Sequence, residues 1–172
     1  MLTTVVFYLS SAIAVAATLL ALTRANAAHG LVWLILSLLA VAVLFFLLGA
    51  PFAAALQVLI YAGAIMVLFV FVVMMLNLGA AGVERERAWL DGVSWIAPGL
   101  VAGILLVQLL LAMQYGDARL AGAAVPPKMV GLALYGPYVL AVEIASMLLL
   151  AALVGAYHIA RRFSARADGG AP

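Results

Sequence analysis

The chain has 172 residues, of which 70% are hydrophobic and only 8% are charged, and its formal net charge at pH 7 is +2. Water-soluble domains are about 45–50% apolar and about 25% charged, so this composition excludes a soluble globular protein. The basic residues stand between or beyond the apolar runs rather than in a patch, which indicates membrane topology rather than nucleic-acid binding. The absence of cysteine excludes disulfides, and also iron–sulfur or cysteine-bound zinc ligation by this chain.

A membrane-spanning helix needs about 20 apolar residues to cross about 30 Å of hydrocarbon. Five runs meet this requirement, which predicts an all-α integral membrane protein with a single transmembrane domain over 1–163 and a polar tail over 164–172. Pro51 and Pro137 stand where helices begin, a position at which the missing N–H costs little. The predicted spans, in chain order, are Leu2–Leu22, Gly30–Gly49, Phe52–Asn77, Val93–Tyr115 and Pro137–Ala160.

The distribution of positive charge predicts the orientation of these spans. With the N-terminus outside, the inner segments contain six basic residues and the outer segments contain two, as the positive-inside rule favours. No basic residue precedes the first apolar run, and that run is too long for a signal peptide, so we expect it to be retained. The inner residues are Arg24, Arg85, Arg87, Arg161, Arg162 and Arg166, and the outer ones are Arg119 and Lys128, both in the long loop Gly116–Gly136.

Glu143 is the one acidic or basic residue that lies well inside a predicted span. Ionisable groups at membrane depth are expensive, so this carboxyl requires an explanation. One interpretation is a protonated side chain that hydrogen-bonds a neighbouring helix. The other is a titratable group beside a water path. Ser146 lies three residues further on the same helical face and is a candidate for the same polar contact.

The third predicted span also carries a small polar patch, made by Gln57 and Tyr61 four residues apart. We predict interhelical hydrogen bonds for Gln57, and likewise for the isolated Ser37 and Gln108 of other spans. No pair of histidines has metal-ligand spacing, and no phosphate-binding loop or nucleophile motif is present. The sequence therefore predicts no catalytic, cofactor-binding or metal-binding residue in this chain.

The middle of the third span combines Gly63 with bulky and flexible neighbours. Gly63 lies close to the bilayer midplane, and a glycine there costs about 1 kcal/mol against alanine in a water-soluble helix. It either permits close packing of a partner helix or weakens the helix locally. Met66 and Phe69 follow on the same span, and methionine supplies an adaptable packing surface.

Two stretches of this sequence resemble subunit J of bacterial respiratory complex I, the counterpart of mitochondrial NADH dehydrogenase subunit 6. The more specific one is Tyr61–Asn77, with the sequence YAGAIMVLFVFVVMMLN, and the other is Gly136–Leu150, with the sequence GPYVLAVEIASMLLL. Weaker similarity covers the second span around His29 and Trp33. The resemblance covers nearly the whole chain, except the loop Gly116–Gly136 and the tail. Gln57 stands where many bacterial relatives carry a glutamate, and an amide cannot titrate.

The resemblance implies a membrane-arm subunit of a proton-pumping NADH:quinone oxidoreductase in the bacterial inner membrane, with a periplasmic N-terminus and a cytoplasmic C-terminus. It implies partners that resemble subunits A, H and K, and a complex that uses FMN, iron–sulfur clusters and a quinone, none of them bound by this chain. It also implies that the third helix carries a π-bulge around Tyr61–Phe69 and gates a water path by rotating. The residues expected to line or gate this path are Tyr61, Gly63, Met66, Phe69 and Glu143.

Two alternatives stay open at this point. The first is an equivalent subunit of a multisubunit cation/proton antiporter, because those complexes contain related helices. The second is a purely structural assembly subunit. A free-standing transporter is the weakest interpretation, since the chain is small and shows no paired half-helices.

Overall fold

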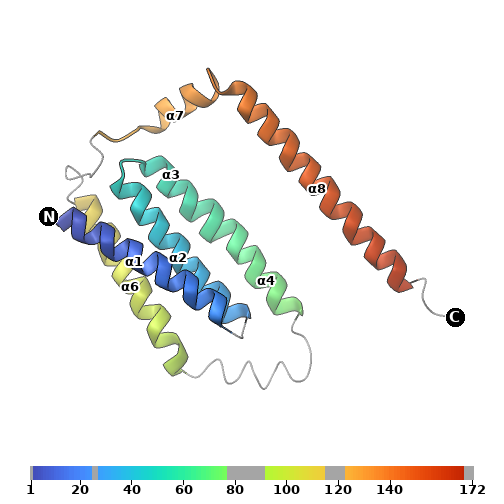
Figure 1. Ribbon diagram of the computed structural model, residues 1–172, viewed down its shortest axis with the longest axis horizontal. Helices are drawn as coiled ribbons and strands as arrows, with labels where there is room; N and C mark the ends of the chain where they lie inside the picture. The colour runs from blue at the N-terminus through green and yellow to red at the C-terminus, as the bar shows by residue number, and fades with distance from the viewer. Residues whose placement is uncertain (1, 25–26, 77–91, 115–122, 169–172) are drawn as a thin grey trace. The chain divides into compact units, whose positions relative to one another are not determined.

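The computed structural model describes residues 2–24, 27–76, 92–114 and 123–168 and contains helices in each of these ranges (Figure 1). Five helical segments are long and apolar enough to cross a membrane, which confirms the predicted all-α fold and its five spans. The elements are α1 (Leu2–Thr23), α2 (Ala27–Leu47), α3 (Pro51–Leu56), η1 (Gln57–Ile65), α4 (Met66–Leu76), α6 (Gly92–Gln114), α7 (Pro127–Leu134) and α8 (Val139–Asp168).

The observed spans differ from the predicted ones mainly at their ends. The third span is one continuous helical run built of α3, η1 and α4, and α8 continues into the predicted tail as far as Asp168. The helix α7 lies in a segment that was predicted only as loop. The predicted helix ends at Asn77 and Tyr115, and the charged run Glu84–Arg87, lie outside the described residues.

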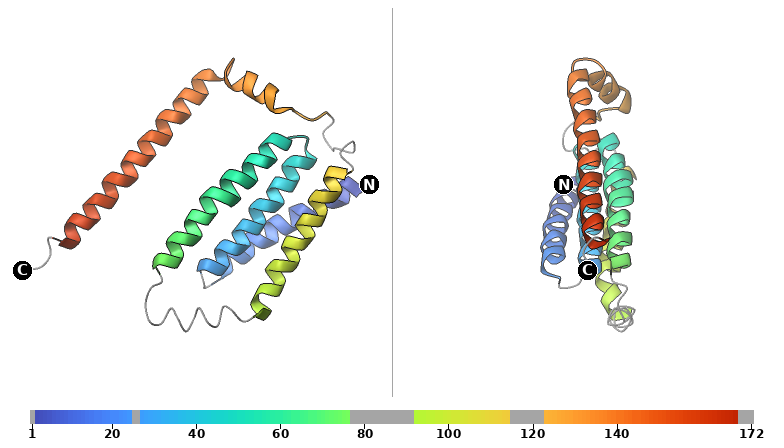
Figure 2. Two further views of the ribbon diagram at one scale, coloured as in Figure 1. Left: turned by 180° about the vertical axis from the view of Figure 1, so that it is seen from behind. Right: turned by 90° about the vertical axis from the view of Figure 1, so that its right-hand side faces the viewer.

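The chain divides into two compact units, residues 1–126 and 127–172. In the first unit α2 is the central helix: it packs against α1, against α6, and against the run α3–η1–α4. Figure 2 shows α2 between α4 and α6, with α1 crossing this layer. α2 is accordingly the most buried of the five spans.

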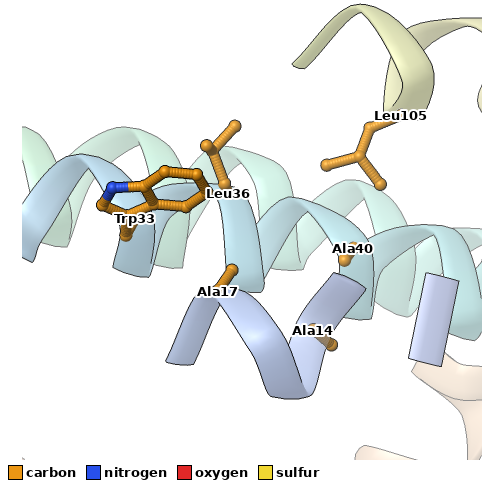
Figure 3. Packing of buried hydrophobic residues seen from close by; sticks show 6 residues of the cluster. All are labelled: Ala14, Ala17, Trp33, Leu36, Ala40 and Leu105. Carbon is orange, nitrogen blue, oxygen red and sulfur yellow. The ribbon is translucent and has the colours of Figure 1, made fainter. Parts of the chain in front are cut away.

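Small residues allow α1 and α2 to approach closely. Ala17 of α1 and Ala40 of α2 are almost completely buried, and the larger side chains of Trp33, Leu36 and Leu105 fill the space around them (Figure 3). Lipid is as apolar as these side chains, so close van der Waals packing rather than exclusion from water holds such helices together. A stripe of alanines in the sequence therefore determines which helix faces meet.

Two polar contacts connect α1 to its neighbours. The Ser10 hydroxyl donates a hydrogen bond of 2.6 Å to Oε1 of Gln108 on α6. The hydroxyls of Thr18 and Ser37 lie 2.7 Å apart between α1 and α2, and Ser37 also lies 3.0 Å from the carbonyl oxygen of Ala14. The predicted interhelical hydrogen bonds of Ser37 and Gln108 are confirmed.

At one end of the first unit, aromatic contacts hold the helix ends together. The Arg24 guanidinium lies 6.0 Å from the ring centre of Trp33, a cation–π distance. The rings of His29 and Trp95 lie 5.9 Å apart and connect the beginnings of α2 and α6. Counting spans along the chain places the end of α1 and the beginnings of α2 and α6 on one side of the membrane, and these contacts agree with that count.

At the other end, a tight turn joins α2 to α3. Gly49 adopts φ +82°, a left-handed conformation that favours glycine, and Pro51 begins α3. The N–H of Val125 donates a hydrogen bond of 2.9 Å to the Gly49 carbonyl. The segment before α7 is therefore attached to the α2–α3 turn, which lies on the same side of the membrane by the same count.

The second unit consists of α7, a turn, and α8. The turn carries backbone hydrogen bonds from Tyr135 to Gly131 (3.0 Å), from Tyr138 to Ala133 (3.1 Å) and from Val139 to Gly136. A Cβ atom added to Gly136 would lie only 2.7 Å from the Leu132 carbonyl oxygen, so this corner requires glycine. Figures 1 and 2 show α7 turning away from the axis of α8 at this corner.

Candidate functional site

The third span changes its helical register at η1, a π-helix over Gln57–Ile65. The N–H of Gln57 points to the carbonyl of Ala53, four residues back, as in an α-helix. At the far end, the N–H of Met66 points to the carbonyl of Tyr61, five residues back. A π-helical element in this span is thus confirmed, but it begins at Gln57 and ends at Ile65, earlier than the predicted stretch Tyr61–Phe69.

The π-helix shifts the packed face of the third span by one residue. Ala54 and Gln57 are buried before the shift, and Ala62 (7% exposed) and Met66 (9% exposed) are buried after it. The step from Gln57 to Ala62 is five residues, whereas a regular α-helix repeats its face every three or four residues. Tyr61, which an α-helix would bring onto the Gln57 face, is instead 51% exposed.

The predicted gating residues are therefore separated within this span. Met66 packs inside the unit, whereas Tyr61 and Phe69 are about half exposed on its outside. Gly63 lies between them, and a Cβ added there would stand 3.1 Å from the Val58 carbonyl oxygen. That distance is tighter than ordinary van der Waals contact, so an alanine would require the helix to adjust.

An apolar cavity of about 400 Å³ lies beside the beginning of η1. It is bounded by α2, by α6, and by Pro51, Ala54, Ala55 and Val58 of the third span. All of its lining residues are apolar, so in this conformation their side chains offer water no hydrogen bonds.

Glu143 belongs to the second unit, one turn into α8. Its side chain is exposed within this chain, and the whole apolar stretch of α8 is unburied. The Ser146 hydroxyl donates a hydrogen bond of 2.8 Å to the backbone carbonyl of Glu143 rather than to its carboxyl group. Among the described residues, no group of three or more histidines, cysteines or carboxylates is placed to hold a metal ion.

Comparison with known proteins adds the decisive observation. The family model for NADH-ubiquinone/plastoquinone oxidoreductase chain 6 matches residues 17–159. The chain belongs to this family. It is 57% identical to NADH-quinone oxidoreductase subunit J of Pseudomonas aeruginosa, over 91% of this chain and 95% of the relative. It is 53% identical to subunit J of Escherichia coli K12, over 90% of this chain and 85% of the relative, and 46% identical to subunit J of Buchnera aphidicola subsp. Schizaphis graminum, over 91% and 96%.

Family membership and the five apolar helices together show a multi-pass protein of the bacterial inner membrane, a subunit of NADH-quinone oxidoreductase. Other subunits of respiratory complex I are consequently its partners. This favours the complex I interpretation over the antiporter alternative. It leaves the question of what the π-helical third span does in that complex.

Proposed function

We propose that this subunit scaffolds the membrane arm and gates the proton path that couples quinone reduction to proton translocation, through a change of register in its third span. The observation that carries the proposal is the one-residue shift of the packed face between Gln57 and Ala62. π-Helical segments within α-helices frequently occur at functional sites. Here the segment divides two well-packed α-helical pieces of a single span.

Conversion of η1 to a regular α-helix would move a different set of side chains onto the packed face. Removing the extra residue per turn rotates everything beyond it by about 100°. Counting in α-helical steps from Gln57 then brings Tyr61, Ile65 and Leu68 onto that face, in place of Ala62 and Met66. The α form thus places Tyr61 one turn after Gln57 on the same face.

That exchange changes the polarity of the space beside the third span. In the π form the side chains that line the neighbouring cavity offer water no hydrogen bonds. In the α form two polar side chains share one face and offer donors and acceptors to a chain of waters. The π form therefore corresponds to a closed path and the α form to an open one, with Phe69 and Met66 moving as the helix turns.

The scaffolding part of the proposal concerns the exposed faces. α8 is apolar and unburied within this chain, and its Glu143 carboxyl stands in a span. We assign these faces to contacts with subunits that resemble A, H and K, with the N-terminus periplasmic, in keeping with the charge distribution. Glu143 then serves the proton path at the contact between subunits.

The test biases the register at Gly63 in the assembled complex. Gly63→Ala adds a Cβ 3.1 Å from the Val58 carbonyl oxygen in the π form, and this close approach should shift the equilibrium away from the π form. We expect fewer protons pumped per NADH oxidised. Gly103→Ala is the matched control, because its Cβ would meet nothing within 4 Å.

The structure of each variant complex reports the register directly. A Gly63→Ala complex whose third span is entirely α-helical, yet which pumps as the wild type does, would rule out gating by this segment. Loss of assembly in Gly63→Ala but not in Gly103→Ala would instead favour the purely structural role.

A further inference from the structure

Most apolar residues of the short helix α7 lie opposite its one charged residue, Lys128. At 3.6 residues per turn, Met129, Val130, Ala133 and Leu134 fall on one side of α7, and Lys128 falls on the other, together with Leu132. Both Lys128 and Met129 are exposed within this chain. This is the residue pattern of a helix that lies at a boundary between apolar and polar surroundings.

The position of α7 along the chain puts it next to such a boundary. The membrane span of α8 begins at Val139, and only the turn Tyr135–Tyr138 separates it from α7. Four residues extend at most about 14 Å even when fully stretched, and hydrogen bonds make this turn compact. α7 is therefore held within or beside the headgroup layer, which adds about 5–8 Å on each side of the hydrocarbon.

The corner between the two helices fits the same location. The rings of Tyr135 and Tyr138 are 79% and 61% exposed, and tyrosine is enriched where its ring meets the apolar edge of a bilayer and its hydroxyl meets water. Gly136 keeps the corner bent, since a Cβ there would stand 2.7 Å from the Leu132 carbonyl oxygen. The bend lets α7 lie along the membrane surface while α8 crosses it.

We propose that α7 is an interfacial anchor whose partner is the phospholipid surface: its apolar side rests on the acyl boundary, and the Lys128 ammonium meets lipid phosphates. α7 adjoins the membrane span of α8, and the positive charge of Lys128 complements the negative charge of phospholipid phosphates. The anchor does not depend on gating by the third span. The anchor fixes the depth at which α8 enters, and therefore the depth of Glu143, which lies about 6 Å along the helix from Val139.

The chain has no cysteine, so a maleimide–polyethylene glycol gel shift of this subunit reports only an introduced one. Lys128→Cys and Met129→Cys are compared in the complete complex, reconstituted in phosphatidylcholine vesicles with and without phosphatidylglycerol. We expect Lys128→Cys to react and Met129→Cys to be protected.

A phospholipid with a photoreactive group near its headgroup should cross-link to α7 in the same vesicles. Equal reactivity of the two positions overturns the proposal, and so does protection without cross-linking, which would mean that another subunit covers α7.

Two further variants test the charge and the corner. Lys128→Gln, combined with Met129→Cys, should remove the extra protection that phosphatidylglycerol gives, an effect of roughly fivefold for one lysine at an anionic surface. Gly136→Ala should expose Met129→Cys by opening the corner. Gly131→Ala, whose Cβ would meet nothing within 4 Å, should leave the protection unchanged. The anchor is also contradicted if neither Lys128→Gln nor Gly136→Ala changes the protection of Met129→Cys from the maleimide.

Discussion

The Ser10 hydroxyl and the Gln108 amide form a 2.6 Å hydrogen bond between α1 and α6, and both side chains are buried. Oε1 of Gln108 accepts this bond, while its Nε2 is buried without a partner in the described part of the chain. An unpaired buried donor costs free energy. This contact therefore connects α1 to α6, although Nε2 of Gln108 has no hydrogen-bond partner in the described part of the chain.

Replacing Ser10 by alanine should destabilise the subunit more than replacing both residues with apolar ones. Ser10→Ala leaves the whole Gln108 amide unpaired, at a cost of about 1–3 kcal/mol, whereas Ser10→Ala combined with Gln108→Leu removes the buried polar atoms. The temperature at which the detergent-solubilised complex releases this subunit measures the difference. A double variant that is less stable than Ser10→Ala would contradict this account of the pair.

Tyr61→Phe should lower proton pumping without lowering assembly. The ring is half exposed in the π form, so loss of the hydroxyl removes little packing there, but the α form loses one of the two polar groups, Tyr61 and Gln57, that share its packed face. Pumping per NADH oxidised in proteoliposomes is the measurement. Tyr8→Phe is the matched control, because Tyr8 is 68% exposed on α1. The proposal fails if the two variants pump equally well.

Glu143→Gln should reduce pumping severalfold while the complex still assembles. Glutamine keeps the size and the hydrogen-bonding head of the side chain but cannot carry a proton. Ser146→Ala is the control, because in the described part of the chain the Ser146 hydroxyl donates to the backbone of its own helix, and it should change little. Full pumping by Glu143→Gln would identify the carboxyl as a structural contact between subunits.

Gly49→Ala should weaken the α2–α3 turn by about 1–2 kcal/mol, the cost of placing an L-residue in the left-handed region. The added Cβ would lie 3.5 Å from the Ala123 carbonyl oxygen, an ordinary contact, so the effect comes from the backbone and not from a clash. Release of the subunit on heating measures it. Gly155 lies within α8, and a Cβ added there would meet nothing within 4 Å, so Gly155→Ala should not destabilise the subunit. An equal loss of stability in both variants would refute the explanation.

The spans were predictable because each is a long apolar run with a clear end. Pro51 marks one beginning in both sequence and structure. The exact position of the π-helix was not predictable from hydropathy, since Gln57–Ile65 is apolar on nearly every side and a uniformly apolar helix shows no periodicity that would reveal a change of register. Its presence was expected from resemblance, and its earlier beginning at Gln57 required the structure.

Ser10 and the helix α7 were not predicted from the sequence, for different reasons. Ser10 is one of several hydroxyl residues in the first span, but its spacing to Ala14 and Thr18, four and eight residues on, would have marked the face that packs against other helices. The helix α7 is too short for a hydropathy signal. The pair Pro126-Pro127 and the position of Lys128 among apolar residues are the sequence features that mark its beginning.

The hydrogen bond from Val125 to Gly49 has a consequence for biogenesis. It joins residues that are synthesised far apart in time, because the third span and α6 must both be made before Val125 emerges. The turn between α2 and α3 is therefore made before this hydrogen bond can form, and the bond forms only after α6 has been synthesised. Since the bond uses main-chain atoms alone, it tolerates side-chain replacement at position 125 but not a proline, which has no N–H to donate.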